Sequence, residues 1–181
     1  MKEKLLFLQH IQISRMKTRV ITLHKGEVLY DIEALAYKYT EAASLEGKAK
    51  DALAADHNDT TDGRILSRMM TARDAQLRKR IKFALAPVSS TTSENKPDSA
   101  NEYVYNLSVA DGFDDNMLEV VQIQMHDYIV RGSLLDWYKK LGLQTIAVDA
   151  VEVGELEENI VSTLRTPSYT NRPLQPFGPR K

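Results

Sequence analysis

The chain of 181 residues contains no cysteine, which excludes disulfide bonds and thiolate chemistry. Its longest apolar runs are only a few residues, far short of the ~20 that a membrane-spanning helix needs. The amino-terminal stretch MKEKLLFLQHIQISRMK has a charged start but no small-residue cleavage site, so we do not expect a signal peptide. These absences predict a chain without a membrane segment. They fit a reducing compartment, or an assembly held together without covalent bonds.

Signatures of catalysis are also missing. There is no glycine-rich phosphate loop and no serine or cysteine nucleophile motif. His126 and Asp127 are adjacent, but neighbours on a helix point ~100° apart, so a structural histidine is expected rather than a general base. We therefore predict a protein that is not an enzyme and has no catalytic residue.

One acidic segment offers oxygen ligands for a hard cation. Its ligand-type residues are Asp56, His57, Asp59 and Asp62. The segment lacks the central glycine and the final glutamate of a calcium-binding loop, and a solvated turn explains the same residues. We predict no metal site and no cofactor, with a metal-dependent enzyme at this segment as the competing hypothesis.

Hydrophobic periodicity and capping residues predict a mainly α fold, a compact bundle of about four helices with a short β-hairpin or strand pair. The expected helices cover 27–55, 63–86, 115–142 and 150–164, and the expected strands cover 18–23 and 103–109. The longest helix has two apolar faces, and Trp137 should be buried on one of them. Gly132 in that helix is tolerable if a partner backbone approaches closely there.

The chain divides into three parts. Residues 1–26 form an amino-terminal arm or strand, 27–164 a helical body with an exposed loop at 87–102, and 165–181 an extended proline-rich arm. Charge is sorted along these parts: +5 over 1–26, −6 over 27–62, +6 over 63–86, −3 over 87–113, −7 over 114–164 and +4 over 165–181. Either oppositely charged helices neutralise each other within one subunit, or they form complementary faces on successive subunits.

The helix expected over 63–86 carries seven cations and one acid, Asp74. Clustered cations are typical of nucleic-acid contact because phosphates need them. Arg64 and Arg68 share one side of the helix, whereas Arg78, Lys79 and Arg80 fan around it, so only part of the set can face one ligand. Pairing with the acidic first helix is the competing interpretation.

The chain ends with RTPSYTNRPLQPFGPRK, which holds four of the six prolines, two aromatic residues, four cations and no acid. Such a stretch forms neither a helix interior nor a central strand, and it can span ~50 Å. It is either a disordered end or an arm that docks on another subunit, with the acids of 149–158 as a candidate docking surface. The candidate oligomer contacts are Tyr169, Arg172, Pro173, Phe177 and Arg180.

Four stretches together, LYDIEALAYKYTEA, ARDAQLRKRIKF, MHDYIVRGSLLDWYKKLGL and the proline-rich ending, resemble head-to-tail connector or ring proteins of Bacteroidetes tailed phages and prophages, including crAss-like phages. The resemblance covers about residues 27–181. It implies a structural virion protein of the neck that forms a ring around the DNA channel, held by arms between subunits.

The partners that the resemblance implies are copies of this chain, in a ring of roughly six or twelve, and adjacent portal, ring or tail proteins. Non-specific contact with packaged DNA is also expected, but no membrane contact. The location would be the virion, and the host cytoplasm during assembly. The alternative is a nucleic-acid-binding regulatory protein that uses the basic helix 63–86.

Overall fold

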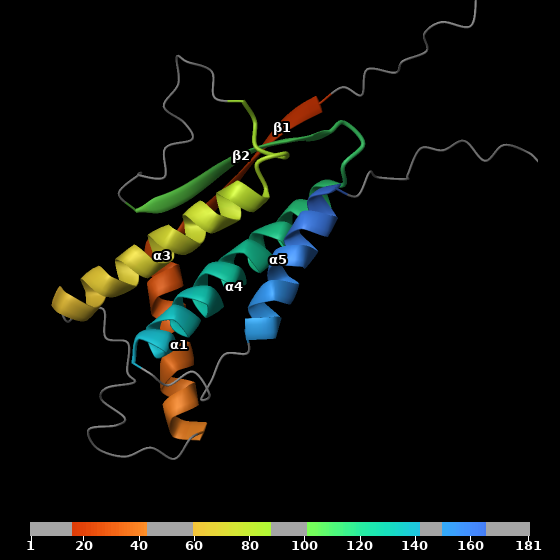
Figure 1. Cartoon of the computed structure of the whole chain (residues 1–181). Coiled ribbons are helices and arrows are strands. Elements are labelled where there is room, and N and C mark those ends of the chain that lie inside the picture. The colour runs from red at the N-terminus through yellow and green to blue at the C-terminus, as the bar shows by residue number, and fades with distance from the viewer. Residues whose placement is uncertain (1–15, 43–59, 88–100, 142–149, 166–181) are drawn as a thin grey trace, which may run out of the picture.

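The computed structural model describes residues 16–42, 60–87, 101–141 and 150–165. Its elements are β1 (Met16–His24), α1 (Lys25–Ala42), α3 (Thr60–Arg80), β2 (Glu102–Ala110), α4 (Asp115–Lys140) and α5 (Ala150–Arg165). The helices lie on one side of the two-stranded sheet, and α4 runs between α3 and α5 (Figure 1). The mainly α fold with about four helices and a strand pair is confirmed within these residues.

The two strands pair antiparallel, with Ile21 opposite Tyr105 and Leu23 opposite Tyr103. The predicted pairing of 18–23 with 103–109 is therefore confirmed. Alternate residues of β2 are buried, because a strand presents successive side chains to opposite faces. The buried face of the sheet packs against the helices, and its other face is solvated.

The helix predicted over 63–86 is wrong at its carboxyl end, since α3 ends at Arg80. After one turn, Leu85 forms an isolated antiparallel bridge with Leu107 of β2. The Ala86 N–H donates to the carbonyl of Asn106 at 2.7 Å. The outer edge of β2 would otherwise leave polar backbone groups unpaired, and this demand outweighs the helical periodicity.

The first helix also begins differently from its prediction. The helix was expected to begin at residue 27, but α1 starts at Lys25, directly after β1. Residues 43–55 of the predicted helix lie outside the described residues. Both α1 and α3 pack mainly against α4 rather than against each other.

The central helix α4 begins at a capping residue, as predicted. The Asp114 carboxylate accepts a hydrogen bond from the Asn116 N–H at 2.9 Å. Trp137 is buried, at 2% exposed. The second apolar face is correct only in the carboxyl-terminal half of the helix, because Val120 and Ile123 are 41% and 56% exposed.

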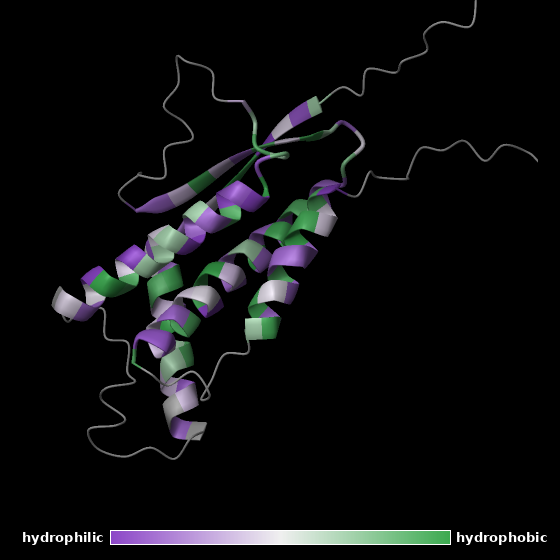
Figure 2. Cartoon of the chain, viewed as in Figure 1, coloured by the Kyte–Doolittle hydropathy of each residue, from purple (hydrophilic) through white to green (hydrophobic). Residues whose placement is uncertain are grey.

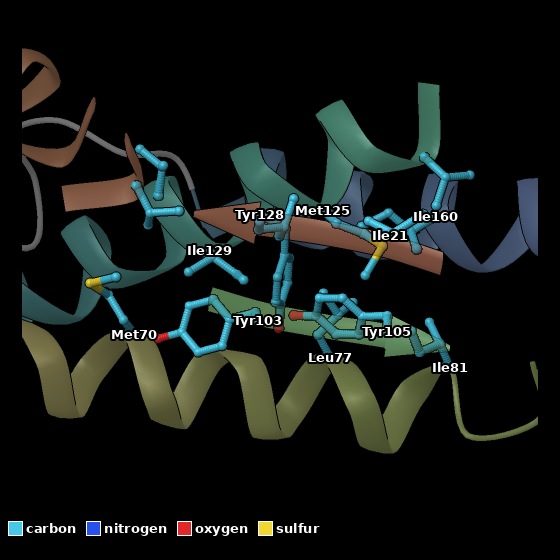
Figure 3. Close-up of a cluster of buried hydrophobic side chains, with 14 of the residues drawn as sticks. Ile21, Met70, Leu77, Ile81, Tyr103, Tyr105, Met125, Tyr128, Ile129 and Ile160 are labelled. Atoms are coloured by element: carbon cyan, nitrogen blue, oxygen red, sulfur yellow. The ribbon is translucent and has the colours of Figure 1, made fainter. Parts of the chain in front are cut away.

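The core joins α3, α4, α5 and both strands in one cluster of buried side chains. In Figure 3, Met70, Leu77 and Ile81 point from α3 toward Tyr103 and Tyr105 of β2. Each of these five side chains is at most 1% exposed. Apolar side chains are thus removed from water on three sides of α4, which holds the solvent face of α3 in a fixed orientation.

Gly132 marks a close approach between α3 and α4, but not of a backbone as predicted. A Cβ placed there would lie 2.8 Å from Arg73 Cδ and 2.9 Å from Arg73 Nε. The Arg73 guanidinium donates to both carboxylate oxygens of Asp136, at 2.7 and 2.6 Å. The glycine therefore leaves space for an interhelical ion pair.

We expect Gly132→Ala to destabilise the protein, although alanine is favoured in helices by about 1 kcal/mol. The bidentate pair holds Arg73 in place, so the added methyl group must displace it. In an Arg73→Ala background the same substitution should stabilise. Urea unfolding of the wild-type protein, the two single variants and the double variant gives the coupling free energy between positions 73 and 132.

Gly154→Ala provides the matched control. A Cβ at Gly154 meets nothing within 4 Å, so this substitution should stabilise α5 by about 1 kcal/mol. If Gly132→Ala stabilised the wild-type protein as much as Gly154→Ala does, the space at Gly132 would not be needed for Arg73.

Candidate nucleic-acid interface

The cations of α3 and of the turn after it fall into two groups, and the first group pairs with carboxylates of the same chain. Arg73 pairs with Asp136 of α4. Arg80 pairs with Glu157 and Glu158 of α5. The expected competition from the acidic first helix is thus replaced by pairing with α4 and α5, because these two helices lie beside α3 in the fold.

The third internal cation, Arg78, belongs to a buried network. Its Nε donates to both oxygens of the Asp74 carboxylate, at 3.0 and 2.9 Å, and Nη2 donates to the Val104 carbonyl at 3.0 Å. The Tyr105 hydroxyl donates to Asp74 at 2.6 Å. Burial, and then the Asp74 charge, raise the pKa of Tyr105, so its hydroxyl remains a donor. This network fixes α3 to β2.

The second group remains in solvent. Its members are Arg64, Arg68 and Lys79 of α3 and Lys82 in the turn that follows, all exposed, and we call them the basic face. Arg64 and Lys79 are 15 residues apart, which is about 22 Å along a helix. Arg68 and Lys79 differ by 11 residues, close to three turns, so they point the same way. No ion pair joins any of the four to another described residue.

Small and hydroxyl side chains separate the cations of the basic face. The exposed residues between them include Ser67, Thr71, Ala72 and Ala75. Of the two acids of α3, Asp74 is fully buried and Asp62 lies in the first turn. Hydrophilic and apolar residues alternate along α3 in Figure 2, as expected for a helix with one solvent face. Between Arg64 and Arg80 no exposed carboxylate of α3 repels a polyanion from the basic face.

The predicted metal-ligand segment and the His126–Asp127 pair form no binding site among the described residues. Asp56, His57 and Asp59 lie outside the described residues, and no three His, Asp or Glu residues of the described ranges gather as a metal site. His126 Nε2 lies 3.4 Å from Asp31 of α1 and its Nδ1 3.8 Å from Asp127. This histidine links α4 to α1.

The candidate oligomer contacts also lie outside the described residues. They are Tyr169, Arg172, Pro173, Phe177 and Arg180. Their candidate docking surface, the acids of 149–158, is largely engaged already. Glu152 pairs with Arg131 at 2.6 Å, and two further glutamates of α5 pair with Arg80.

No protein-family model, curated protein or solved structure matches this chain. None of the helices in the described ranges combines the length and apolar character that crossing a membrane requires. The basic face was only partly visible in the sequence. The cation count marked the helix, but the separation into internal and solvent-facing cations depends on residues far along the chain.

Proposed function

We propose that this protein is a non-enzymatic structural protein of a tailed-phage virion. It assembles with copies of itself into a ring in the neck and faces the DNA with the basic face of α3. The observation that carries the proposal is the acid-free basic face, whose four cations have no partner among the described residues. The resemblance to neck ring proteins supplies the assembly.

The basic face suits DNA that moves past it. Lysine and arginine bind phosphates through a sequence-independent, salt-dependent attraction that permits sliding. A surface spanning about 22 Å meets several phosphates, and the intervening small side chains keep the helix close to the duplex. The internal cations Arg73, Arg78 and Arg80 meanwhile hold α3 in position.

The sorted charge is compatible with assembly. A ring requires a heterologous contact between two different surfaces of the same chain, and oppositely charged surfaces fix its register. Some carboxylates on elements other than α3 contact no cation among the described residues. Glu119 on α4 is an example. Such carboxylates are available to cations of a neighbouring subunit.

A sequence-specific DNA-binding regulator is the second candidate. Arg64 and Arg68 are one turn apart and form no ion pair with another described residue, and arginine side chains can contact guanine edges bidentately. Competition with mixed-sequence duplex DNA separates the two functions. A structural ring protein loses its labelled DNA to any duplex, whereas a regulator retains its preferred site.

The DNA contact is tested with two charge-matched double variants. For Arg64→Gln with Lys79→Gln, we expect weaker binding to mixed-sequence duplex DNA. The slope of log affinity against log salt should fall by about 2, since each lost phosphate contact removes about 0.9. Fluorescence anisotropy titrations over a range of salt concentrations measure both quantities.

The control, Lys38→Gln with Lys139→Gln, removes the same charge from α1 and α4. Both lysines are exposed and outside the basic face, so wild-type binding is expected. Equal losses in the two double variants would show that only net charge matters. Sedimentation of the full chain tests the ring: a single species of several chain masses supports it, and a monomer at all concentrations contradicts it.

A further inference from the structure

A hollow of about 310 Å³ lies where β1 ends, α1 begins and the first half of α4 passes beside them. We call it the β1–α4 groove. It is lined by Thr22, Leu23, Glu27, Glu119, Gln122, Ile123 and His126. The Gln122 side chain donates to the Thr22 carbonyl at 3.1 Å, which holds the strand edge against the helix.

An apolar strip on the first half of α4 enters the groove at Ile123. Met117, Val120 and Ile123 are 38%, 41% and 56% exposed. Farther along the same helix Leu134 and Trp137 are buried, at 0% and 2% exposed. Large apolar side chains that stay in water together mark a surface for a partner.

The groove is also acidic. Two of its lining residues are glutamates, Glu27 and Glu119, and no lysine or arginine lines it among the described residues. Asp31 and Asp127 flank the groove through their contacts with His126. Such a surface repels DNA and favours a partner that carries cations together with apolar side chains.

Residues 166–181 of this chain have that composition. They contain three cations, no acid, four prolines and two aromatic residues, Tyr169 and Phe177. A proline-rich segment loses less conformational entropy on docking than an ordinary chain does, and apolar grooves are its usual acceptors. We infer that the β1–α4 groove receives residues 166–181 of a neighbouring copy.

The arm begins where α5 ends and is long enough to reach a neighbouring copy. The last residue of α5, Arg165, places its guanidinium over the Phe83 ring at 4.8 Å, next to the end of α3. The groove lies at α1, and both α1 and α5 pack on α4 rather than on each other. Sixteen residues span about 50 Å, enough to reach another subunit.

This inference rests on the proposed ring, because each copy then gives one arm and receives one, the arrangement that closes a ring. The β1–α4 groove thus replaces the acids of α5 as the docking surface for the arm. Three of those acids already pair with Arg131 and Arg80. The arm cations meet the groove carboxylates, while Phe177 and Tyr169 cover the apolar strip.

The absence of cysteine in the natural chain makes a disulfide test free of background. Two full-length variants, Ile123→Cys and Phe177→Cys, are mixed, assembled and treated with a mild oxidant. We expect a mixed disulfide dimer as the main cross-linked product, because a disulfide forms only between Cα atoms about 4.4–6.8 Å apart. Adding Glu27→Gln with Glu119→Gln to the Ile123→Cys chain should reduce its yield.

Val151→Cys is the matched control for the acidic face of α5. Val151 is 63% exposed, yet its cysteine should not pair with that of Phe177→Cys. A product with Val151→Cys but not with Ile123→Cys would overturn the inference in favour of α5. A product formed only within one chain of the doubly substituted Ile123→Cys and Phe177→Cys protein would place the arm on its own subunit, which also overturns it.

The two proposals fail separately. A particle of several chain masses that binds DNA but gives no cross-link at Ile123→Cys would remove the groove as the arm acceptor and leave the proposed function intact. A monomer that cross-links only within one chain would remove the ring. Mass spectrometry of the cross-linked bands identifies which chains are joined.

Discussion

Replacing Trp137 with alanine should lower the free energy of unfolding by about 3–5 kcal/mol. Trp137 is 2% exposed and lies in the half of α4 that neighbouring elements cover on several sides. The surrounding side chains can only partly fill the space that the indole leaves. Domains are stable by about 5–15 kcal/mol, so the variant should lose a large share of its stability. Urea unfolding followed by circular dichroism measures it.

The control separates volume from hydrogen bonding. The indole Nε1 is buried without a hydrogen-bond partner in the described structure. Trp137→Phe therefore removes no bond and keeps most of the ring, so it should cost less than half of the alanine effect. Val151→Ala, at an exposed site, should change stability by no more than about 0.5 kcal/mol. A wild-type unfolding midpoint for Trp137→Ala would contradict the burial.

The parts of the fold that were predictable are those in which a short-range pattern decides. Tyr103, Tyr105 and Leu107 alternate with smaller residues, and a period of two belongs to a half-buried strand. Trp137 continues the apolar spacing of α4, which places it in the core. In both cases the pattern and the tertiary packing make the same demand.

The end of α3 could not be predicted, because a distant partner decides it. The apolar spacing of the predicted helix continues through Ile81, Phe83 and Leu85. The structure leaves Phe83 47% exposed and turns Leu85 into a bridge with β2. The edge of β2 is 20 or so residues farther along the chain, and no local propensity records its unpaired groups.

For the candidate site too, some ion pairs follow from spacing along the sequence and others only from the fold. Asp74 and Arg78 are four residues apart, a spacing that favours an ion pair within a helix and could have removed Arg78 from the basic set. The partners of Arg73 and Arg80 are 63 and 77 residues away. Only the fold brings them together, so only the fold shows which four cations have no ion pair with another described residue.

Replacing Asp74 with alanine should destabilise the protein by about 3–5 kcal/mol. The carboxylate is fully buried and accepts hydrogen bonds from Arg78 and from the Tyr105 hydroxyl. Its loss leaves a guanidinium that is only 13% exposed without its counterion, and a buried hydroxyl without an acceptor. Urea unfolding followed by the fluorescence of Trp137, the single tryptophan, measures the change.

Two comparisons show whether the cost arises from the uncompensated charge. Tyr105→Phe removes one neutral donor and should cost only about 1–2 kcal/mol. Glu155→Ala, at an exposed acid of α5, should change stability by no more than about 0.5 kcal/mol. If Asp74→Ala were as mild as Glu155→Ala, Arg78 would find another partner and the network would not anchor α3.

The decisive variant removes all three polar groups together. Asp74→Leu with Arg78→Met and Tyr105→Phe should be far more stable than Asp74→Ala, because an apolar cluster pays no desolvation of a buried charge. Arg78 is turned inward, so this protein should also keep the wild-type salt slope for DNA, provided that it folds. A reduced slope would place Arg78 among the phosphate contacts. An unchanged slope would limit the DNA contact to cations on the solvent side of α3. The buried network would then serve only to hold that helix in place.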